Sequence, residues 1–322
     1  MDLSIIIPTY NRASTLRATL DGLDVQETSV ACEIIVVDDG STDSTADITD
    51  SFRRKSKLPV SYYFQPNRKQ GAARNLGARF AEGEWLLFLG DDIVPGPELL
   101  KQHLDKHREK PYYADGSPVP RVVIGYTAWP SEWKKTRFLE FIGEQGWQFG
   151  FSLIQDFDDV PFNFFYTSNL SMPRKLFQDS GGFDEDFTVY GWEDIELSLR
   201  LREMGIRIVF QPGAKAFHYH PTNLFSFAER QRQVGLSACC LLEKHPELGD
   251  FLGVNRMPCY SLRRRLQMAL LFQACRLTEK TDWPDLSRYY PDLLSYWYLR
   301  GVLEGFSAKS SDFYRRELKR GK

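Results

Sequence analysis

The sequence of 322 residues has little of several features that mark whole classes of protein. Its formal net charge is only −2, so no overall positive field favours a nucleic-acid partner. No apolar run approaches the ~20 residues that a membrane-spanning helix needs. The first apolar run is as short as a strand and follows no basic segment, unlike a secretory signal. These absences favour a cytoplasmic protein that binds no nucleic acid.

Cysteine is also scarce, and its spacing follows no recognised pattern. There are five cysteines, an odd number, and no two of them form a Cys-x-x-Cys pair. This argues against a disulfide framework. It predicts reduced, mostly buried thiols at Cys32, Cys239, Cys240, Cys259 and Cys275.

Glycine is absent from "PTYNRAST" (8–15), the segment that follows the first predicted strand. Dehydrogenases place a Gly-x-Gly-x-x-Gly turn there, so a dinucleotide-binding enzyme is disfavoured. Nucleotidyltransferases on similar folds usually carry a glycine-rich, basic loop at this point. That function stays open as an alternative, with the sequence against it.

The residues that are present describe a globular α/β chain, with 42% hydrophobic and 26% charged residues. Short apolar runs rich in β-branched residues alternate with segments whose apolar residues recur at helical spacing. Strand, helix, strand, helix predicts a mostly parallel central sheet with helices on both faces. The predicted strands are 3–8, 32–40, 60–65 and 84–90, and the predicted helices between them are 12–26, 41–56 and 70–83.

The second half of the chain is less regular at first. Residues 110–165 are rich in turns and aromatic residues and predict irregular loops with short strands. Helices are predicted at 173–182 and 191–205, each ending at glycine. The segments "IRIVF" and "AKAFHYH" predict two further strands, and the chain beyond Pro221 predicts a helical subdomain.

Polar residues follow all four of the early strands, in the segments "PTYNR", "DDGSTD", "QPNRKQG" and "GDDIVP". The carboxyl ends of parallel strands meet at one edge of a sheet, and ligands of such sheets bind beyond that edge. Three of the four segments carry charges suited to a nucleotide, phosphates or a metal. We therefore expect one ligand site built from all four.

Two adjacent acidic pairs stand at these strand ends. Asp91 and Asp92 come directly after an apolar strand, where one or two carboxylates suffice to hold phosphate-bound Mg²⁺ or Mn²⁺. Asp38 and Asp39 end the second strand, where a carboxylate can accept the imide N–H of a uracil or the hydroxyls of a ribose. Each pair also has a purely structural interpretation, because Asp favours turns and helix N-termini.

A third acidic pair and two histidines come later. Glu193 and Asp194 open a helix, where the helix dipole favours acids and where a carboxylate can also serve as a general base. His218 and His220 alternate on a predicted strand and would share a face. Histidine is the commonest nitrogen ligand for divalent metals, so either could complete a metal site.

Four motifs in order resemble one known family. "SIIIPTYNR", "VVDDGSTD", "RNLGARFAEGEWLLFLGDD" and "GGFDEDFTVYGWEDIELSLRLREMG" together resemble family 2 glycosyltransferases of the GT-A fold, over about residues 3–235. The resemblance implies a Rossmann-like sheet and inverting transfer of a sugar from a nucleotide diphosphate donor with Mn²⁺ or Mg²⁺. It further implies a cell-surface polysaccharide or lipid-linked glycan as the product and a hydroxyl of a saccharide or lipid-linked glycan as the acceptor. The base is expected to be uracil.

The resemblance also assigns roles residue by residue. Asp194 would be the catalytic base, with Glu193 orienting it or the acceptor. Asp92 would bind the metal with His218, preferred over His220, and with Asp91 beside them. The acceptor would meet Trp147, Asn169 and Trp192. The nucleotide would be lined by Pro8, Tyr10, Arg12, Asp38, Asp39, Arg74 and Asp91.

One departure from the family pattern concerns the metal site. The family commonly reads Asp-x-Asp where this chain reads Gly90-Asp91-Asp92, so the first acid, which often meets the ribose, is missing. Asp91 is the candidate to replace it. A catalytically inactive nucleotide- or sugar-binding module therefore stays open as a second alternative.

The division of the chain follows from these assignments. Residues 1–222 would form the catalytic domain, with a nucleotide-binding half at 1–110 and an acceptor-side half at 111–222. Residues 223–322 would form a helical extension. Within it, "LRRRLQMALLFQACRL" (262–277) is basic and apolar at helical spacing. It favours packing within the protein, while contact with the inner face of the cell membrane stays open.

Overall fold

The computed structural model describes residues 1–27, 30–109, 120–256, 261–279 and 284–320 and divides the chain into two compact units. The first unit comprises residues 1–133, 143–185 and 193–220. The second comprises residues 134–142, 186–192 and 221–322, so two short segments from the predicted catalytic half group with the helical extension.

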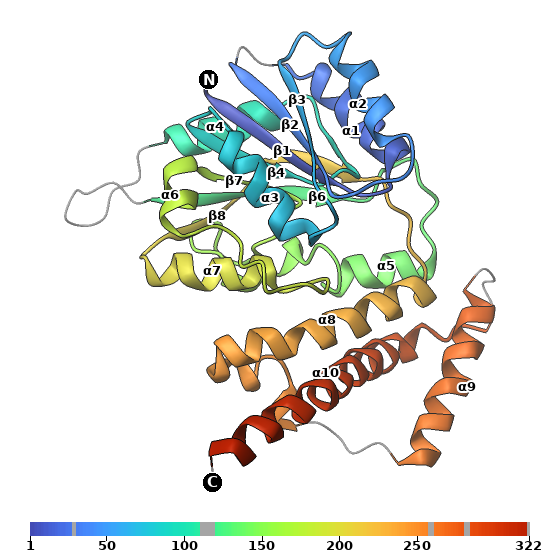
Figure 1. Cartoon of the computed structure of the whole chain (residues 1–322). Helices are drawn as coiled ribbons and strands as arrows, with labels where there is room; N and C mark the ends of the chain where they lie inside the picture. The colour runs from blue at the N-terminus through green and yellow to red at the C-terminus, as the bar shows by residue number, and fades with distance from the viewer. Residues whose placement is uncertain (28–29, 110–119, 257–260, 280–283, 321–322) are drawn as a thin grey trace. The chain divides into compact units, whose positions relative to one another are not determined.

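A sheet of eight strands forms the centre of the first unit, in the order β3-β2-β1-β4-β7-β6-β8-β5 (Figure 1). The predicted parallel arrangement is found for β1 to β4, while β7 and β5 run antiparallel to their neighbours. The strands are β1 Leu3–Thr9, β2 Cys32–Asp38, β3 Val60–Phe64, β4 Trp85–Leu89, β5 Ile93–Pro95, β6 Arg121–Ala128, β7 Asn169–Pro173 and β8 Arg207–His218.

The strand order places a switch point beside β1. The chain runs from β1 outward to β2 and β3, then returns to form β4 on the other side of β1. The carboxyl ends of β1 and β4 therefore lie side by side at this switch point, the place where ligands of such sheets bind in the crevice beyond the strands.

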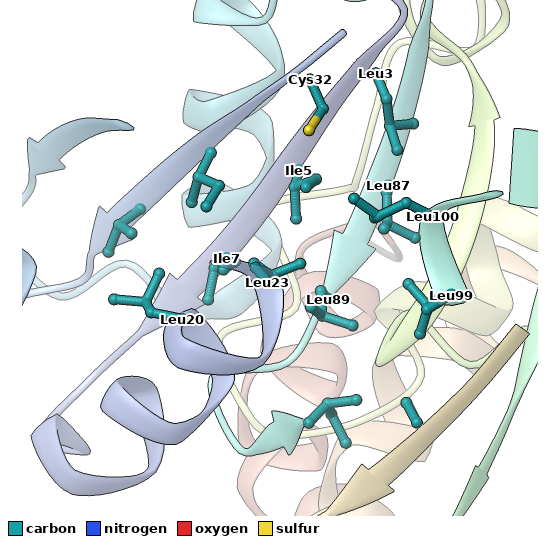
Figure 2. Close-up of a cluster of buried hydrophobic side chains, with 14 of the residues drawn as sticks. Leu3, Ile5, Ile7, Leu20, Leu23, Cys32, Leu87, Leu89, Leu99 and Leu100 are labelled. Atoms are coloured by element: carbon teal, nitrogen blue, oxygen red, sulfur yellow. The ribbon is translucent and has the colours of Figure 1, made fainter. Parts of the chain in front are cut away.

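Helices cover both faces of this sheet. α1 Ala13–Asp24, α2 Thr45–Arg53 and α4 Leu99–Arg108 pack on one face. There β1 and β4 contribute Ile5, Ile7 and Leu87, and α1 and α4 contribute Leu20, Leu23 and Leu100 (Figure 2). α3 Lys69–Phe80 packs on the other face so closely that a Cβ on Gly77 would lie 2.6 Å from the Ile6 side chain. Burial on both faces explains why β1 and β2 are apolar almost throughout.

The segments predicted as irregular or broken are more regular than expected. β6 is eight residues long and pairs in parallel with β8, which is one continuous strand rather than two. The break between the two predicted strands coincides with a shift in the pairing register between Gly125 and Tyr126 of β6. The remaining helices of this unit are α6 Arg174–Asp179 and α7 Glu193–Glu203, with 3₁₀ turns at Phe151–Leu153 and Phe162–Phe164.

A buried polar cluster crosses this core between α4 and β7. His103 hydrogen-bonds with the Asn169 side chain through Nε2 and with Ser171 Oγ through Nδ1, each at 2.8 Å. His107, one helical turn on, reaches the same hydroxyl at 2.8 Å and stacks on Trp85. Burial lowers the pKa of His103 to about 4, and burial also lowers the pKa of His107 well below its usual value.

These two histidines predict acid sensitivity of the fold. The unfolded chain takes up protons below pH 6.5, whereas folded His103 stays neutral to about pH 4. Stability is therefore complete above pH 6.5 and falls as the pH drops, by about 3 kcal/mol for His103 over that window. Urea unfolding of the wild type and of His103→Gln, at steps from pH 7.5 to 4.5, measures it. The variant should be less stable at pH 7.5 and show a shallower decline, and His245→Gln, in the second unit, should keep the wild-type slope. Equal slopes for the wild type and His103→Gln would contradict this origin.

The second unit is helical. It contains most of α5 Arg137–Glu144, together with α8 Leu224–Lys244, α9 Leu262–Thr278 and α10 Tyr290–Arg320, and 3₁₀ turns at Pro246–Gly249, Val254–Arg256 and Ser287–Tyr289. Among the described residues, no helix combines the length and the apolar character needed to cross a membrane. None of the four described cysteines forms a disulfide, and Cys32, Cys239 and Cys275 are buried as predicted, while Cys259 lies outside the described residues.

Glycines bring α8 and α10 into backbone contact. A Cβ on Gly235 would lie 1.9 Å from the Tyr298 carbonyl oxygen, and one on Gly301 would lie 1.9 Å from that of Arg232. Real atoms cannot approach so closely, so a side chain at either position must push the helices apart. Arg232 pairs with Glu304 of α10 across this contact and with Glu229 on its own helix.

Gly301→Ala is therefore expected to destabilise the second unit by about 1–3 kcal/mol, the usual cost of overpacking. The sign is diagnostic, because Gly→Ala inside an unhindered helix stabilises by about 0.5–1 kcal/mol. Denaturant unfolding followed by circular dichroism measures it. A variant that unfolds at a higher denaturant concentration than the wild type would show that the helices do not touch at Gly301.

Candidate active site

The loops after β1, β2 and β3 meet at the predicted edge of the sheet. The Asp39 N–H donates to the Thr9 carbonyl at 2.9 Å, and the Thr42 N–H donates to Asn11 Oδ1 at 2.7 Å. Asn11 adopts a positive φ of 53°, unusual for a residue with a side chain. The convergence predicted from the strand ends is therefore present in the structure.

Asp91 and Asp92 form a buried carboxylate pair at this edge, beside the switch point. Thr9 Oγ1 donates to Asp91 at 2.8 Å, while Arg12 donates to Asp91 at 3.2 Å and also to Asp92. Burial and the neighbouring Asp92 charge raise the pKa of Asp91 to about 7, against the opposing effect of Arg12. Burial acts against ionisation of Asp92 too, but the pKa of Asp92 is lowered because His218 and Arg12 stabilise its charge.

His218 is the nitrogen ligand that the sheet places next to this pair. β5 and β8 pair so that Ile93 lies opposite His218, and the His218 Nε2 atom is 3.3 Å from Asp92 Oδ2. His220 lies beyond the end of β8, so the two histidines do not share a strand face as expected. Trp129 and Phe149 enclose the His218 ring, with ring centroids 5.2 and 5.3 Å away.

The donor set at Asp92 suits a nucleotide-bound divalent cation. Among the described residues, no three histidine, cysteine or acidic side chains gather into a complete metal site. Mg²⁺ on a nucleotide, however, needs only one or two carboxylates from the protein and takes phosphate oxygens and water for the rest. Asp92 and His218 offer one oxygen and one nitrogen on facing atoms. The buried Nδ1 atom of His218 finds no hydrogen-bond partner in the described part of the chain.

Gly90 explains the missing first acid of the family pattern. A Cβ at this position would lie 2.8 Å from the Ile93 side chain and 3.1 Å from Asp92 Oδ1. An aspartate at 90 would therefore force Ile93 or Asp92 to move. Thr9 donates to one oxygen of Asp91 and Arg12 to the other, and the role of Asp91 in place of that acid stays a prediction.

Asp38 and Asp39 are held by the protein itself. Asp38 accepts from the Ser41 N–H and the Tyr62 hydroxyl, each at 2.7 Å. Asp39 accepts from the Gln65 side chain and from the backbone N–H groups of Arg68 and Lys69, at 2.7–2.8 Å. Asp39 therefore shapes the loop that opens α3, and both acids lie at the crevice in fixed orientations.

Glu193 and Asp194 stand at the start of α7 and face α3. Gln70 and Arg74, one turn apart on α3, both donate to Glu193 Oε1, Arg74 at 3.2 Å. Burial and the adjacent Glu193 charge raise the pKa of Asp194 to about 7, against the effect of Arg74. Asp194 accepts only the Ile195 N–H, at 2.9 Å, among the hydrogen bonds found in the described residues. The carboxyl group of Asp194 thus has a pKa near neutral pH, and it lies beside Glu193, whose carboxylate Gln70 and Arg74 hold in place.

The sequence of the region that builds this site decides the family. Residues 4–181, more than half of the chain, match the family described as Glycosyl transferase family 2. The chain belongs to glycosyl transferase family 2. Residues 158–222 also match a family described as the N-terminal domain of galactosyltransferase, and this stretch includes Glu193, Asp194 and His218.

Individual members of family 2 resemble the chain over most of its length. Validoxylamine A glucosyltransferase of Streptomyces hygroscopicus is 34% identical over 279 residues, which cover 76% of this chain and 61% of that protein. Hyaluronan synthase of Pasteurella multocida is 28% identical over 296 residues, covering 81% of this chain and 29% of the synthase. The chain thus spans less than two thirds of the length of these relatives.

Solved structures confirm the predicted GT-A fold. Mannosyltransferase PcManGT from Pyrobaculum calidifontis, in complex with GDP-Man and Mn²⁺, has a TM-score of 0.62 at 18% identity and covers 95% of this chain and 87% of its own. Staphylococcus aureus TarS 1-349 has a TM-score of 0.52 at 20% identity and covers 97% of this chain and 92% of its own.

Not every predicted site residue of this family 2 chain lies where expected. Asn169 was predicted to meet the acceptor, but it is 1% exposed and bound to His103, to the Tyr126 carbonyl and to the Ala214 carbonyl. That prediction is wrong, because β7 pairs with β4 and carries Asn169 into the core. Arg74 contacts Glu193 at 3.2 Å, and its predicted contact with the nucleotide stays a prediction.

The other predicted residues stay candidates. Tyr10 is 48% exposed after β1, and Pro8 is half-buried at the end of that strand. Trp147 is half-buried in the loop before Phe149. Trp192 has a positive φ of 71° and donates through Nε1 to the Val234 carbonyl within the second unit.

Sequence reasoning missed Trp129. It follows β6, whose parallel register with β8 sets Ala128 opposite Phe217 and so brings Trp129 beside His218. Its Nε1 atom is buried and, like His218 Nδ1, has no hydrogen-bond partner among the residues that the structure describes. The signal was an aromatic residue just past a strand end, in a segment that the composition predicted to be irregular. Two unsatisfied nitrogens at one place are suited to a bound polar ligand.

Proposed function

We propose that the chain is an inverting glycosyltransferase that moves a sugar from a UDP-linked donor to a hydroxyl of a saccharide or lipid-linked glycan, with Mn²⁺ or Mg²⁺. One observation carries this proposal: a short chain of hydrogen bonds links the carboxylate pair Asp91-Asp92 to the carboxylate pair Glu193-Asp194. Asp91 binds Thr9, Thr9 binds Asp39, Asp39 binds Lys69 and the next residue, Gln70, binds Glu193.

The end of this path at Asp91, beside Asp92, is the side that binds the sugar donor. A divalent cation there would be held by Asp92 and His218, and when bound it would stabilise the charge that builds on the diphosphate leaving group. Asp38 and Asp39 hold fixed orientations beside the crevice and line the nucleoside, with Tyr10 and Pro8. Trp129 Nε1 and His218 Nδ1, which lack partners among the described residues, would form hydrogen bonds with the bound nucleotide sugar.

The Asp194 end is the acceptor side. The acceptor hydroxyl must lose a proton as it attacks the sugar, and a general base needs a pKa near the working pH. Asp194 has such a pKa, about 7, while Glu193 is fixed by Gln70 and Arg74 and orients its neighbour. A base on one side of the sugar and the leaving group on the other would invert the anomeric carbon.

The relatives narrow the choice of probes. TarS is known in complex with UDP-GlcNAc, and PcManGT with GDP-Man. Several relatives are named for polymer products or acceptors, including hyaluronan synthase, chondroitin synthase and poly(ribitol-phosphate) beta-N-acetylglucosaminyltransferase. A glycan acceptor for this chain is consistent with those names.

Calorimetric titration of UDP and GDP, each with and without Mn²⁺, tests the proposal. We expect UDP to bind tightly only with Mn²⁺, and to release heat from one site per chain. Binding of GDP in place of UDP would change the proposed donor and keep the chemistry. Binding of neither nucleotide with Mn²⁺ would contradict the proposal and favour the inactive module.

A further inference from the structure

Helix α9 exposes a stripe of four leucines on one face. Leu262, Leu266, Leu270 and Leu277 are 74%, 59%, 74% and 78% exposed. At 3.6 residues per turn these four side chains fall within ~80° of the helix circumference, along all ~25 Å of its length. Single exposed leucines are ordinary, but a row of four on one face marks an interaction surface.

The opposite face of α9 already packs within the second unit. Met268, Phe272 and Cys275 are buried, and the Phe272 ring lies 5.3 Å from Trp297 of α10. The expectation that α9 packs within the protein is therefore correct for this face alone. The leucine stripe is left over after the helix has made its internal contacts.

The charge of α9 fits one kind of partner. Residues 262–278 contain four arginines and no acidic residue, although the whole chain carries more acidic than basic residues. Arg263, Arg265 and Arg276 flank the stripe on its two sides, and all three are exposed. Arg276 lies over the ring of Phe225, which is itself 50% exposed.

We propose that this face of α9 docks on the surface of an anionic phospholipid bilayer. Leucines enter the interface while the flanking arginines meet lipid phosphates, the arrangement of a helix that lies in the membrane plane. A second copy of the chain fits less well, because pairing two such stripes would bring two rows of arginines together without a single acid on either helix. The proposal goes beyond the proposed transferase chemistry and does not depend on it.

Flotation of the full chain with vesicles tests this directly, with no nucleotide present. Vesicles of phosphatidylcholine with about 30% phosphatidylglycerol are compared with vesicles of pure phosphatidylcholine. We expect the chain to bind the anionic vesicles at low salt. Binding should be at least about tenfold weaker to the neutral vesicles, and at least about tenfold weaker at about 0.5 M salt.

Three double variants separate the contributions. Leu266→Ser/Leu270→Ser and Arg263→Glu/Arg265→Glu should each weaken binding at least about tenfold. Arg53→Glu/Arg54→Glu, a matched charge change at the exposed end of α2, should bind like the wild type. Circular dichroism melting checks that all three fold.

Three outcomes would overturn the proposal. The first is a wild type that does not float with anionic vesicles at low salt. The second is an Arg263→Glu/Arg265→Glu variant that floats as well as the wild type. The third is a dimer in sedimentation velocity that Leu266→Ser/Leu270→Ser dissociates, with no vesicle binding, which would assign the stripe to a second copy.

Discussion

Asp194→Asn is expected to lower the rate of sugar transfer by roughly 10²–10⁴-fold, the usual contribution of a general base. Asparagine keeps the size of the side chain and its bond to the Ile195 N–H but cannot accept the acceptor's proton. Binding of the donor nucleotide should not change, since Asp194 lies at the other end of the hydrogen-bonded path. Transfer assays and calorimetry on one preparation separate the two effects.

The pH dependence gives this prediction a second measurement. Asp194 must be ionised to act, and its pKa is raised to about 7. Activity of the wild type should therefore fall about tenfold per pH unit below pH 7 and level off above it. Glu203→Gln, at the exposed end of the same helix, should keep both the rate and the profile. An Asp194→Asn enzyme with wild-type transfer rates would assign the base to another group.

The strands and the crevice edge could be predicted because their signals are local. β1 and β2 are apolar runs that only a strand buried on both faces explains, and each ends in polar residues. Parallel topology then brings those ends together without any knowledge of side-chain contacts. The same logic placed Asp38, Asp39 and Asp92 at one edge.

The partners of these residues could not be predicted, because they come from distant parts of the chain. Arg12 meets Asp91 from 79 positions away, and Arg74 meets Glu193 from 119. Sequence distance carries no information on such pairs. Gln70 and Arg74 lie one turn apart on α3, so the sequence predicts that they share a face of the helix. It does not predict that this face contacts Glu193.

The error at Asn169 has a different origin. A short polar segment after an aromatic loop resembles a binding loop, but β7 returns antiparallel between β4 and β6 and buries the residue. The periodicity of a five-residue strand is too short to show this. His218 was preferred to His220 on resemblance alone. The sheet register supplies the physical reason, because β8 ends at His218, which pairs with Ile93 of β5, and Asp92 directly precedes Ile93.

Asp92→Asn is expected to weaken Mn²⁺-dependent nucleotide binding at least ~100-fold. Loss of a group that only hydrogen-bonds to a metal ligand typically lowers metal affinity by roughly 10–100-fold. Asp92 would bind the ion directly, so its loss should cost more. Calorimetry with the nucleotide that binds the wild type, with and without Mn²⁺, measures it. Asp105→Asn, an exposed acid paired with Lys101 on α4, is the matched control and should bind like the wild type.

Arg12→Gln should have the opposite effect on the metal alone. Arg12 is paired with both Asp91 and Asp92, so it competes with a cation for the same oxygens. Without it, Mn²⁺ should bind more tightly in the absence of nucleotide, while the metal-free protein should melt at a lower temperature because two buried carboxylates have lost their counter-ion. Manganese titration followed by electron paramagnetic resonance, together with melting curves with and without Mn²⁺, measures both. Unchanged Mn²⁺ affinity in Arg12→Gln, alongside an unchanged nucleotide response in Asp92→Asn, would remove the metal from this edge of the sheet and leave the pair as a salt bridge that only joins β1 to β4.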